Sequence, residues 1–397
     1  MPAFSFEQAR QCVLQTVGAA RATPLTETVA LETAAGRVLA EPVPADRDYP
    51  ALARSVRDGY AVRARDLPGE FTVIGEVRAG ESFPGEVAER QAVEIMTGAP
   101  VPRGADAVVM LEHVAREGPR LTAGQPAAPG QFVNPQGSEA RAGEILLHSG
   151  RRLDYTGIAM LAAAGRQNVL VYAAPRVAII ATGDEIVPVT ATPREFQIRN
   201  SNVYSLAAQV ARAGGVPGIL PVARDEVAHT RELIERGLDA DLLLLSGGVS
   251  AGKYDIVERV LEELGAKFFF DRVLIQPGQP LVFGQARGKF FFGLPGNPSS
   301  TMVTFEIFAR AAVELLGGQD DATLHMPYAR LTQDFQHKPG LTRFLPACLS
   351  HDGAEVTPVA WHGSSDVPAM TRANAYMVVD ADRASWQTRD WIRVMLK

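Results

Sequence analysis

The chain has 397 residues, a length that predicts two to four domains. Its composition, 46% hydrophobic and 21% charged, supports packed cores and excludes a disordered tail protein or a coiled coil. With 39 Lys and Arg against 45 Asp and Glu, the net charge of −6 disfavours general nucleic-acid binding, so a bound anion needs a local set of amides and cations.

Nothing in the sequence indicates a membrane or export segment. No apolar run approaches the roughly 20 residues of a membrane helix, and residues 1–10 lack the apolar core of a signal peptide. The two cysteines cannot form a structural zinc site by themselves. We therefore expect a cytoplasmic protein in a reducing compartment.

The N-terminal third predicts helices followed by a β-rich module. Ser5 and Gln8 have the spacing of a capping box, and apolar residues then recur at helical spacing over residues 5–20. A second short helix is expected over 32–40, before three prolines that mark a boundary. Short β-rich runs between Gly/Pro turns follow, at 71–77, 92–96 and 107–111. Residues 152–168 return to a helical pattern.

From Pro175 onward strands and helices alternate. Strands are predicted at 176–181, 216–222, 241–245 and 290–294, and helices at 201–213, 228–237, 254–264 and 299–316. This alternation predicts right-handed βαβ units and a parallel sheet with helices on both faces. After Gly318 short strands return, at 328–331, 354–358, 376–379 and 391–395, and predict a small C-terminal barrel.

Three glycine-containing loops follow predicted strands of the parallel sheet, at 181–185, 246–250 and 294–299. Ligands bind beyond the carboxyl ends of such strands, where glycine lets the backbone approach and helix-start amides can bind phosphate. The loops lack both the Walker and the dinucleotide spacings. A single loop of this kind is more often a plain turn, but three at one sheet edge predict a binding site.

Carboxylates flank these loops, namely Asp184, Glu185, Asp225 and Asp255. Several acids near a phosphate site suit Mg²⁺, which takes oxygen ligands. Helix caps and solvated turns explain Asp184 or Asp225 equally well when each is taken alone. The seven histidines show no metal-ligand spacing, and Cys12 lies on an apolar helical stripe, so we interpret all of these as structural.

Six motifs occur in an order and spacing that resemble the MoeA/gephyrin E-domain family over nearly the whole chain. They span residues 55–61 (SVRDGYA), 96–102 (MTGAPVP), 104–109 (GADAVV), 182–185 (TGDE), 246–250 (SGGVS) and 294–298 (LPGNP). The resemblance implies a multidomain α/β plus β fold. Its parts would be a discontinuous helical linking domain (1–44 and 140–174), a β-rich domain (45–139), a doubly wound, mostly parallel α/β domain of molybdopterin-binding type (175–317) and a small C-terminal β-barrel (318–397).

The resemblance also implies an activity and an assembly. Members insert molybdate into adenylylated molybdopterin, with Mg²⁺-dependent release of AMP to give molybdenum cofactor. The family forms an elongated homodimer whose active site is shared between subunits. The pterin's dithiolene sulfurs hold the molybdenum, so no protein cysteine is needed. Other molybdenum-cofactor biosynthesis proteins are implied as partners.

The family's site residues map onto this sequence position by position. The implied catalytic residues are Asp58 and Thr97 from one subunit with Glu185, Asp225 and Asp255 from the other, and Glu185 and Asp255 are the implied Mg²⁺ ligands. The implied substrate-binding residues are Thr182, Gly183, Asp184, Ser246, Gly247, Gly248, Ser250, Gln276, Gln279, Pro295, Gly296, Asn297, Pro298, Arg343, Ser364 and Ser365.

Three departures from the family pattern stand out. Val56 and Arg57 precede Asp58 where relatives have small or apolar residues, and Glu139 stands where an Asp is expected. Gln276 and Gln279 replace lysines of many relatives, and glutamine donates hydrogen bonds but carries no charge. Arg57 and Arg343 are the candidates to replace that charge.

Two other functions stay open at this point. Residues 175–317 alone resemble the molybdopterin adenylyltransferase that acts one step earlier, and a non-catalytic molybdopterin-binding scaffold would tolerate the two glutamines. Asp58 and Thr97, which lie outside that domain, favour insertion. The sequence does not separate molybdate from tungstate.

Overall fold

The computed structural model describes residues 2–20, 24–248 and 256–397. The chain divides into two compact units, which are described separately. The first comprises Met1–Ala40, Gly150–Leu153 and Val169–Lys397, and the second comprises Glu41–Ser149 and Asp154–Asn168. Among the described residues, no helix has the length and apolar character to cross a membrane.

Helix α1 (Phe6–Ala19) confirms the predicted N-terminal helix. The Gln8 amide donates to Ser5 Oγ (3.2 Å), and the Ser5 amide donates to Gln8 Oε1 (2.9 Å), so the capping box is complete. The helix predicted over 32–40 is wrong. Only a 3₁₀ turn forms, at Leu31–Thr33, because the backbone that follows pairs with a distant segment: the Leu39 amide donates to the Arg151 carbonyl (2.9 Å).

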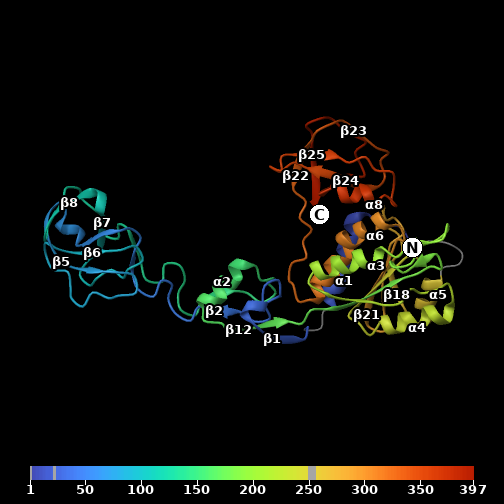
Figure 1. Cartoon of the computed structure of the whole chain (residues 1–397), viewed down its shortest axis with the longest axis horizontal. Coiled ribbons are helices and arrows are strands. Elements are labelled where there is room, and N and C mark those ends of the chain that lie inside the picture. Colours follow the sequence, from blue (N-terminus) through green and yellow to red (C-terminus); the bar gives the residue numbers. More distant parts are fainter. Residues whose placement is uncertain (1, 21–23, 249–255) are drawn as a thin grey trace. The chain divides into compact units, whose positions relative to one another are not determined.

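The predicted doubly wound α/β sheet is confirmed (Figure 1). Its strand order is β16-β13-β17-β21-β20-β18, in which the first four strands are parallel and β20 pairs antiparallel with both β21 and β18. The strands are β13 (Arg176–Ala181), β16 (Val216–Ile219), β17 (Leu242–Ser246), β18 (Lys267–Phe270), β20 (Val282–Ala286) and β21 (Lys289–Leu294). The sequence analysis did not predict β18 and β20.

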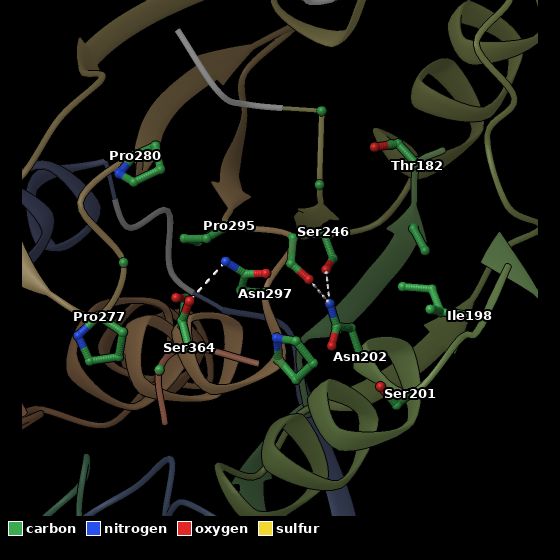
Figure 2. Close-up of a pocket in the computed structure, with 18 of the residues that line it drawn as sticks. Thr182, Ile198, Ser201, Asn202, Ser246, Pro277, Pro280, Pro295, Asn297 and Ser364 are labelled. Atoms are coloured by element: carbon green, nitrogen blue, oxygen red, sulfur yellow. Dashed lines mark hydrogen bonds between the residues drawn. The ribbon is translucent and has the colours of Figure 1, made fainter. Parts of the chain in front are cut away.

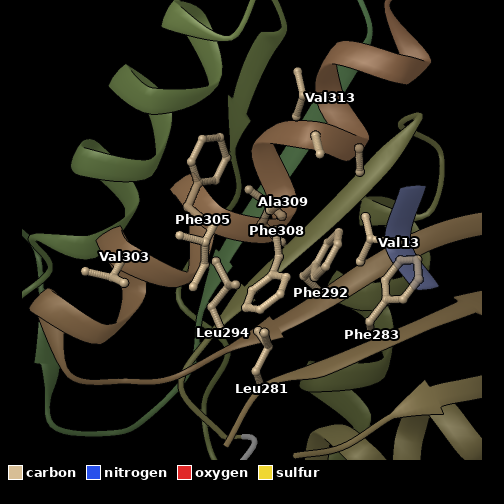
Figure 3. Close-up of a cluster of buried hydrophobic side chains, with 14 of the residues drawn as sticks. Val13, Leu281, Phe283, Phe292, Leu294, Val303, Phe305, Phe308, Ala309 and Val313 are labelled. Carbon is tan, nitrogen blue, oxygen red and sulfur yellow. The ribbon is translucent and has the colours of Figure 1, made fainter. Parts of the chain in front are cut away.

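Successive residues of these strands enter two different cores, as the pleat requires. Phe292 belongs to the core formed with α1, α3 (Asn202–Arg212), α6 (Pro298–Thr304) and α7 (Arg310–Leu316), which Figure 3 shows around Phe283 and Phe308. Its neighbour Phe291 belongs to the core formed with α4 (Val227–Gly237) and α5 (Ile256–Glu263). A π-helical turn, Phe305–Ala309, joins α6 to α7.

The predicted C-terminal barrel is also confirmed. Its strands pair in the order β24-β25-β22-β28-β26, and β26 pairs back with β24, which closes the barrel. They are β22 (Tyr328–Leu331), β24 (Thr342–Leu349), β25 (Glu355–Pro358), β26 (Ala375–Val379) and β28 (Trp391–Leu396), with α8 (Val367–Arg372) before β26. Strand β19 (Ile275–Gln276) pairs with β24, so the barrel continues into the segment 275–280.

The second unit is built on a six-stranded sheet in the order β7-β4-β6-β5-β9-β8. The strands are β4 (Gly59–Val62), β5 (Gly69–Val77), β6 (Gln91–Ile95), β7 (Ala107–Met110), β8 (Val114–Glu117) and β9 (Arg120–Ala123). The three β-rich runs predicted from sequence are β5, β6 and β7. Helix α2 (Tyr155–Ala163) is shorter than the predicted 152–168, because the chain enters strand β12 at Asn168.

Short pairs and turns complete the fold. The pairs are β1 (Thr26–Ala30) with β12 (Asn168–Tyr172), β2 (Val43–Pro44) with β11 (Ile145–Leu147), β3 (Arg54–Ser55) with β10 (Val133–Asn134), β14 (Ile186–Val187) with β15 (Ile198–Arg199), and β23 (Phe335–Gln336) with β27 (Ser385–Trp386). The 3₁₀ turns in the second unit are Ala64–Asp66 and Leu111–His113.

Candidate active site

A pocket of about 810 Å³ lies at the carboxyl ends of β13, β17 and β21, where the sequence predicted a ligand site (Figure 2). Its wall combines the three strand-end loops with the segment 275–280 and a loop of the C-terminal barrel. The residues of this wall that the family resemblance named are Thr182, Glu185, Ser246, Gly247, Gly248, Gln276, Gln279, Pro295, Gly296, Asn297, Pro298 and Ser364.

The loop after β17 lies close to the end of β13. This close approach is possible because the loop begins with two glycines, Gly247 and Gly248. Gly247 and Gly248 have φ of +90° and +66°, where glycine is favoured. A Cβ on Gly248 would lie 2.7 Å from Thr182 Oγ1, closer than atoms pack. The Thr182 hydroxyl is itself buried and has no hydrogen-bond partner among the described residues. These glycines therefore permit a contact that other residues would block.

Asn202, at the start of α3, joins two of the loops, and the sequence analysis did not name it. Its Nδ2 donates to Ser246 Oγ (2.9 Å) and to the Gly296 carbonyl (2.8 Å), as Figure 2 shows. The only signal in the sequence was an Asn at the start of the predicted 201–213 helix. Asn is also common there as a helix N-cap, so this signal does not indicate a role in the pocket. The bonds depend on strand order, which the residue pattern does not reveal.

The barrel loop is attached to the α/β sheet through Ser364. Asn297 Nδ2 donates to Ser364 Oγ (2.8 Å), and the Ser299 amide donates to the Ser364 carbonyl (2.9 Å). Ser365 and Arg343 are outside the pocket wall, although Arg343 pairs in register with Gln276 on the neighbouring strand.

Charge is sparse in this pocket. Within the described part of its wall, Glu185 and Arg199 are the ionisable residues, while Gln276 and Gln279 are neutral. The Glu185 carboxylate lies against Gly183, where an added Cβ would come within 2.4 Å of Glu185 Oε2 and φ is +130°. Gly183 therefore shapes the loop without lining the pocket.

Asp184 and Asp225 lie outside the pocket wall and are close to each other. The Asp225 amide donates to Asp184 Oδ1 (3.4 Å), and Arg224 Nη1 donates to the Asp184 carbonyl (3.1 Å). Arg224 Nη1 also lies 3.9 Å from Asp184 Oδ1, so the two charges partly offset each other. The structure thus places these two acids in adjacent loops beside the pocket, Asp184 after β13 and Asp225 after β16.

Asp58 and Thr97 lie together in the second unit. The Thr97 amide (2.6 Å) and hydroxyl (2.8 Å) both donate to Asp58 Oδ1. These bonds stabilise the carboxylate and hold the pKa of Asp58 below its usual range, the backbone bond having the larger effect.

Thr97 lines a second pocket, of about 490 Å³, within this unit. Arg54, Asn134 and Glu139 share its wall, and Asn134 Nδ2 donates to Glu139 Oε1 (2.8 Å). Glu139, the departure noted in the sequence, is therefore a wall residue of this pocket, whereas Arg57 is not.

Two predicted residues, Ser250 and Asp255, lie outside the described residues. Across the part of the chain that is described, no group of three or more His, Cys, Asp or Glu side chains is arranged to hold a metal. Glu185 is the predicted metal ligand whose position the structure gives, and among the described residues of the pocket wall it is the one carboxylate.

Comparison with known proteins agrees with this architecture. Family models match residues 4–165 (MoeA N-terminal region, domains I and II), 178–315 (probable molybdopterin binding domain) and 328–397 (MoeA C-terminal region, domain IV). The molybdopterin molybdenumtransferase of Bacillus subtilis is 34% identical over 385 residues, covering 94% of this chain and 90% of that protein. The chain belongs to the MoeA family.

Other members support the assignment. The molybdopterin molybdenumtransferase of Staphylococcus aureus is 32% identical over 379 residues, covering 93% of this chain and 90% of that protein. Crystal structures of the molybdopterin biosynthesis MoeA protein from Pyrococcus horikoshii match with a TM-score of 0.83 at 28% identity over all of both chains, and with 0.76 at 31% identity. The MoeA family fold therefore extends over the whole chain.

Proposed function

We propose that this protein is a molybdopterin molybdenumtransferase, which inserts molybdate into adenylylated molybdopterin and releases AMP. The observation that carries the proposal is the 810 Å³ pocket, in which all three strand-end loops of the α/β sheet meet a loop of the C-terminal barrel. Relatives that bear this enzyme name align over more than nine tenths of the chain. Molybdopterin is thus the substrate class that both the site and the relatives support.

The chain's own groups suit a phosphate-bearing ligand. Gly247 and Gly296 allow close backbone approach, and the Ser246 hydroxyl can donate while it accepts from Asn202. Glu185 fits a Mg²⁺ site of the usual kind, in which one or two carboxylates act together with substrate phosphates and water. When bound, Mg²⁺ would neutralise phosphate charge, which this nearly neutral pocket does not do by itself.

We further propose that the enzyme is a homodimer whose sites combine residues of both subunits. In this proposal Asp58 and Thr97 of one subunit act with Glu185, Asp225 and Asp255 of the other. Asp58 belongs to one compact unit of the chain and Glu185 and Asp225 belong to the other, and this separation supports the proposal. The four-domain division predicted from sequence and a cytoplasmic location belong to the same proposal.

AMP release tests the activity directly. The full chain is incubated with adenylylated molybdopterin and Mg²⁺, with molybdate in one arm and tungstate in another, and AMP is followed by chromatography. Oxyanion-dependent AMP release is expected. Binding without AMP release would indicate a scaffold, and pyrophosphate release from ATP and molybdopterin would indicate the adenylyltransferase. The two oxyanion arms also measure metal preference.

A further inference from the structure

One aromatic side chain lines the pocket among the residues described there, that of Trp361 in the barrel loop before α8. Much of the remaining wall is glycine, small polar residues and four prolines, which are Pro277, Pro280, Pro295 and Pro298. Aromatic and proline surfaces are flat and apolar, and they contact the faces of planar rings rather than phosphate. The tryptophan and the prolines therefore suit a planar ring of a ligand, whereas the glycine loops suit its phosphate groups.

Asp366 holds the loop of Trp361 from the side of α8. Its carboxylate accepts hydrogen bonds from the Ala369 amide (2.9 Å) and the His362 amide (3.1 Å). These two bonds, the first having the larger effect, stabilise the charged carboxylate and hold the pKa of Asp366 below its ordinary value. The residue directly after Trp361 is thereby anchored to the start of a helix.

Ser364 holds the same loop from the side of the α/β sheet. It accepts one bond from the Asn297 side chain and one from the Ser299 amide, at 2.8 and 2.9 Å. Figure 2 shows the first of these bonds among the residues that line the pocket. A loop fixed from both sides presents Trp361 before a ligand arrives, which lowers the entropy cost of binding.

The polar atom of the indole ring is shielded from solvent. Trp361 Nε1 is buried and has no acceptor among the residues that the structure describes. The ring surface left for a ligand is therefore carbon. A buried N–H without an acceptor loses its hydration and gains no hydrogen bond, so replacement of the indole by phenylalanine should be tolerated here.

We propose that Trp361 is a specificity-determining residue that stacks on a planar heterocycle of the substrate. This inference rests on the proposed function, because adenylylated molybdopterin has two such rings, adenine and the pterin. Stacking on either ring is the same chemistry, and separate probes distinguish the two sources. The neutral wall formed by Gln276 and Gln279 makes ring contacts more important for affinity than in a strongly cationic pocket.

The test compares three variants of the full chain. Trp361→Leu removes the aromatic ring, and Trp361→Phe keeps one. Trp391→Leu is the matched control, because Trp391 is an exposed barrel tryptophan that stacks with Arg330 and is not in the pocket wall. Calorimetry measures binding of AMP, of a 6-substituted pterin and of ribose 5-phosphate, which has no aromatic ring.

We expect Trp361→Leu to weaken binding of at least one ring-bearing probe by about 5- to 150-fold, the range that loss of base stacking gives. Trp361→Phe and Trp391→Leu should bind nearly as well as the wild type, and ribose 5-phosphate affinity should not change. The ring-bearing probe that loses affinity identifies the stacked heterocycle.

Three results would overturn the proposal. The first is that Trp361→Leu binds both ring-bearing probes with wild-type affinity. The second is that its affinity for ribose 5-phosphate falls as much as its affinity for a ring-bearing probe, which would indicate a collapsed loop. The third is that the wild-type chain binds neither ring-bearing probe. AMP release by the wild-type chain tests the proposed function separately. Failure of the proposed function can therefore be distinguished from failure of the proposed role of Trp361.

Discussion

Asn202 Nδ2 lies 2.9 Å from Ser246 Oγ and 2.8 Å from the Gly296 carbonyl oxygen, so one amide at the start of α3 connects the ends of two neighbouring parallel strands. The carbonyl can only accept, which fixes the orientation of the amide. Both loops that Asn202 holds line the pocket. The position of the two loops therefore depends on a residue outside them.

Asn202→Asp should impair turnover, because a carboxylate of the same shape cannot donate to the Gly296 carbonyl. A displacement of about 1 Å in such loops can cost roughly 100-fold in rate. We expect kcat/KM for AMP release to fall by that order, and the free energy of unfolding to fall by about 1–3 kcal/mol, because the Gly296 carbonyl loses its donor while the Ser246 hydroxyl can still donate to the carboxylate.

Gln209→Ala is the matched control for this prediction. Gln209 lies on the same helix, and its Nε2 donates to the Met302 carbonyl (3.0 Å) and to Glu306 (2.7 Å), outside the pocket. Its loss should cost similar stability and leave kcat/KM unchanged. If both variants lose activity equally, Asn202 acts only through general stability.

Gly248→Ala should be more destabilising than Gly265→Ala. Both glycines have positive φ, +66° and +75°, so each alanine costs about 1–2 kcal/mol of backbone strain. Only at Gly248 does the new Cβ also meet a neighbour, Thr182 Oγ1 at 2.7 Å, whereas Gly265 faces open space. We expect urea unfolding to show a further loss of roughly 1–3 kcal/mol at Gly248. Equal losses would mean that the loop moves away from Thr182 freely.

The sequence predicted those parts of the fold that local pattern determines. The apolar run 176–181 became β13, and the glycines that follow the predicted strands do lie at one sheet edge. The helix expected over 32–40 failed because pairing with residues 151–153 outweighed its local pattern. The apolar runs that form β18 and β20 fit several structures equally well, so periodicity did not reveal them.

The same limit applies to the site. Asn202 and Trp361 reach the pocket only through strand order and through the docking of the barrel loop, and neither lies in a glycine-rich motif. Residues inside motifs, such as Thr182 and Ser246, could be named from sequence because the motif itself forms the turn. Contacts between distant segments carry no such local signature.

Gln279→Lys should tighten binding of an anionic ligand and make it more salt-dependent. Gln279 lines the pocket, and one added charge about 4 Å from a phosphate is worth roughly 1 kcal/mol in water, or about fivefold in Kd. Gln285→Lys is the control, since it adds the same charge on β20, outside the pocket. Titrations with AMP at low and high salt should separate the two variants. Identical affinities and slopes would show that the Gln279 side chain does not reach the ligand.

Thr97→Val should raise the pKa of Asp58 toward its ordinary value without restoring it fully. The variant loses the hydroxyl donor (2.8 Å) but keeps the amide donor (2.6 Å), which has the larger effect. A lowered carboxyl pKa stabilises the fold above the unfolded-state pKa, and this contribution is lost as pH falls through the folded-state pKa. In the variant the contribution should be smaller, and its loss should be complete at a higher pH, because the folded-state pKa is closer to the unfolded-state value.

NMR titration of the carboxyl carbon measures this shift. Asp334 and Thr388 form the same two-bond arrangement in the barrel, at 2.8 Å for both bonds. Thr388→Val should therefore raise the pKa of Asp334, leave that of Asp58 unchanged and keep AMP release intact. A Thr97→Val chain in which Asp58 titrates as in the wild type would contradict the assigned cause.

Mixed dimers of Asp58→Ala and Glu185→Ala chains test whether two subunits share each site. Each variant alone should be nearly inactive. In a two-fold dimer each subunit gives the same surfaces to both sites. If Asp58 of one subunit acts with Glu185 of the other, a mixed dimer has one site with both lesions and one site with neither.

Random re-association of equal amounts makes about half of the dimers mixed, so about a quarter of all sites are intact by this symmetry. Co-refolding should therefore restore roughly a quarter of the wild-type rate of AMP release. If both acids acted within one subunit, every site of a mixed dimer would carry one lesion. No activity would then return, even with mixed dimers verified by native mass spectrometry.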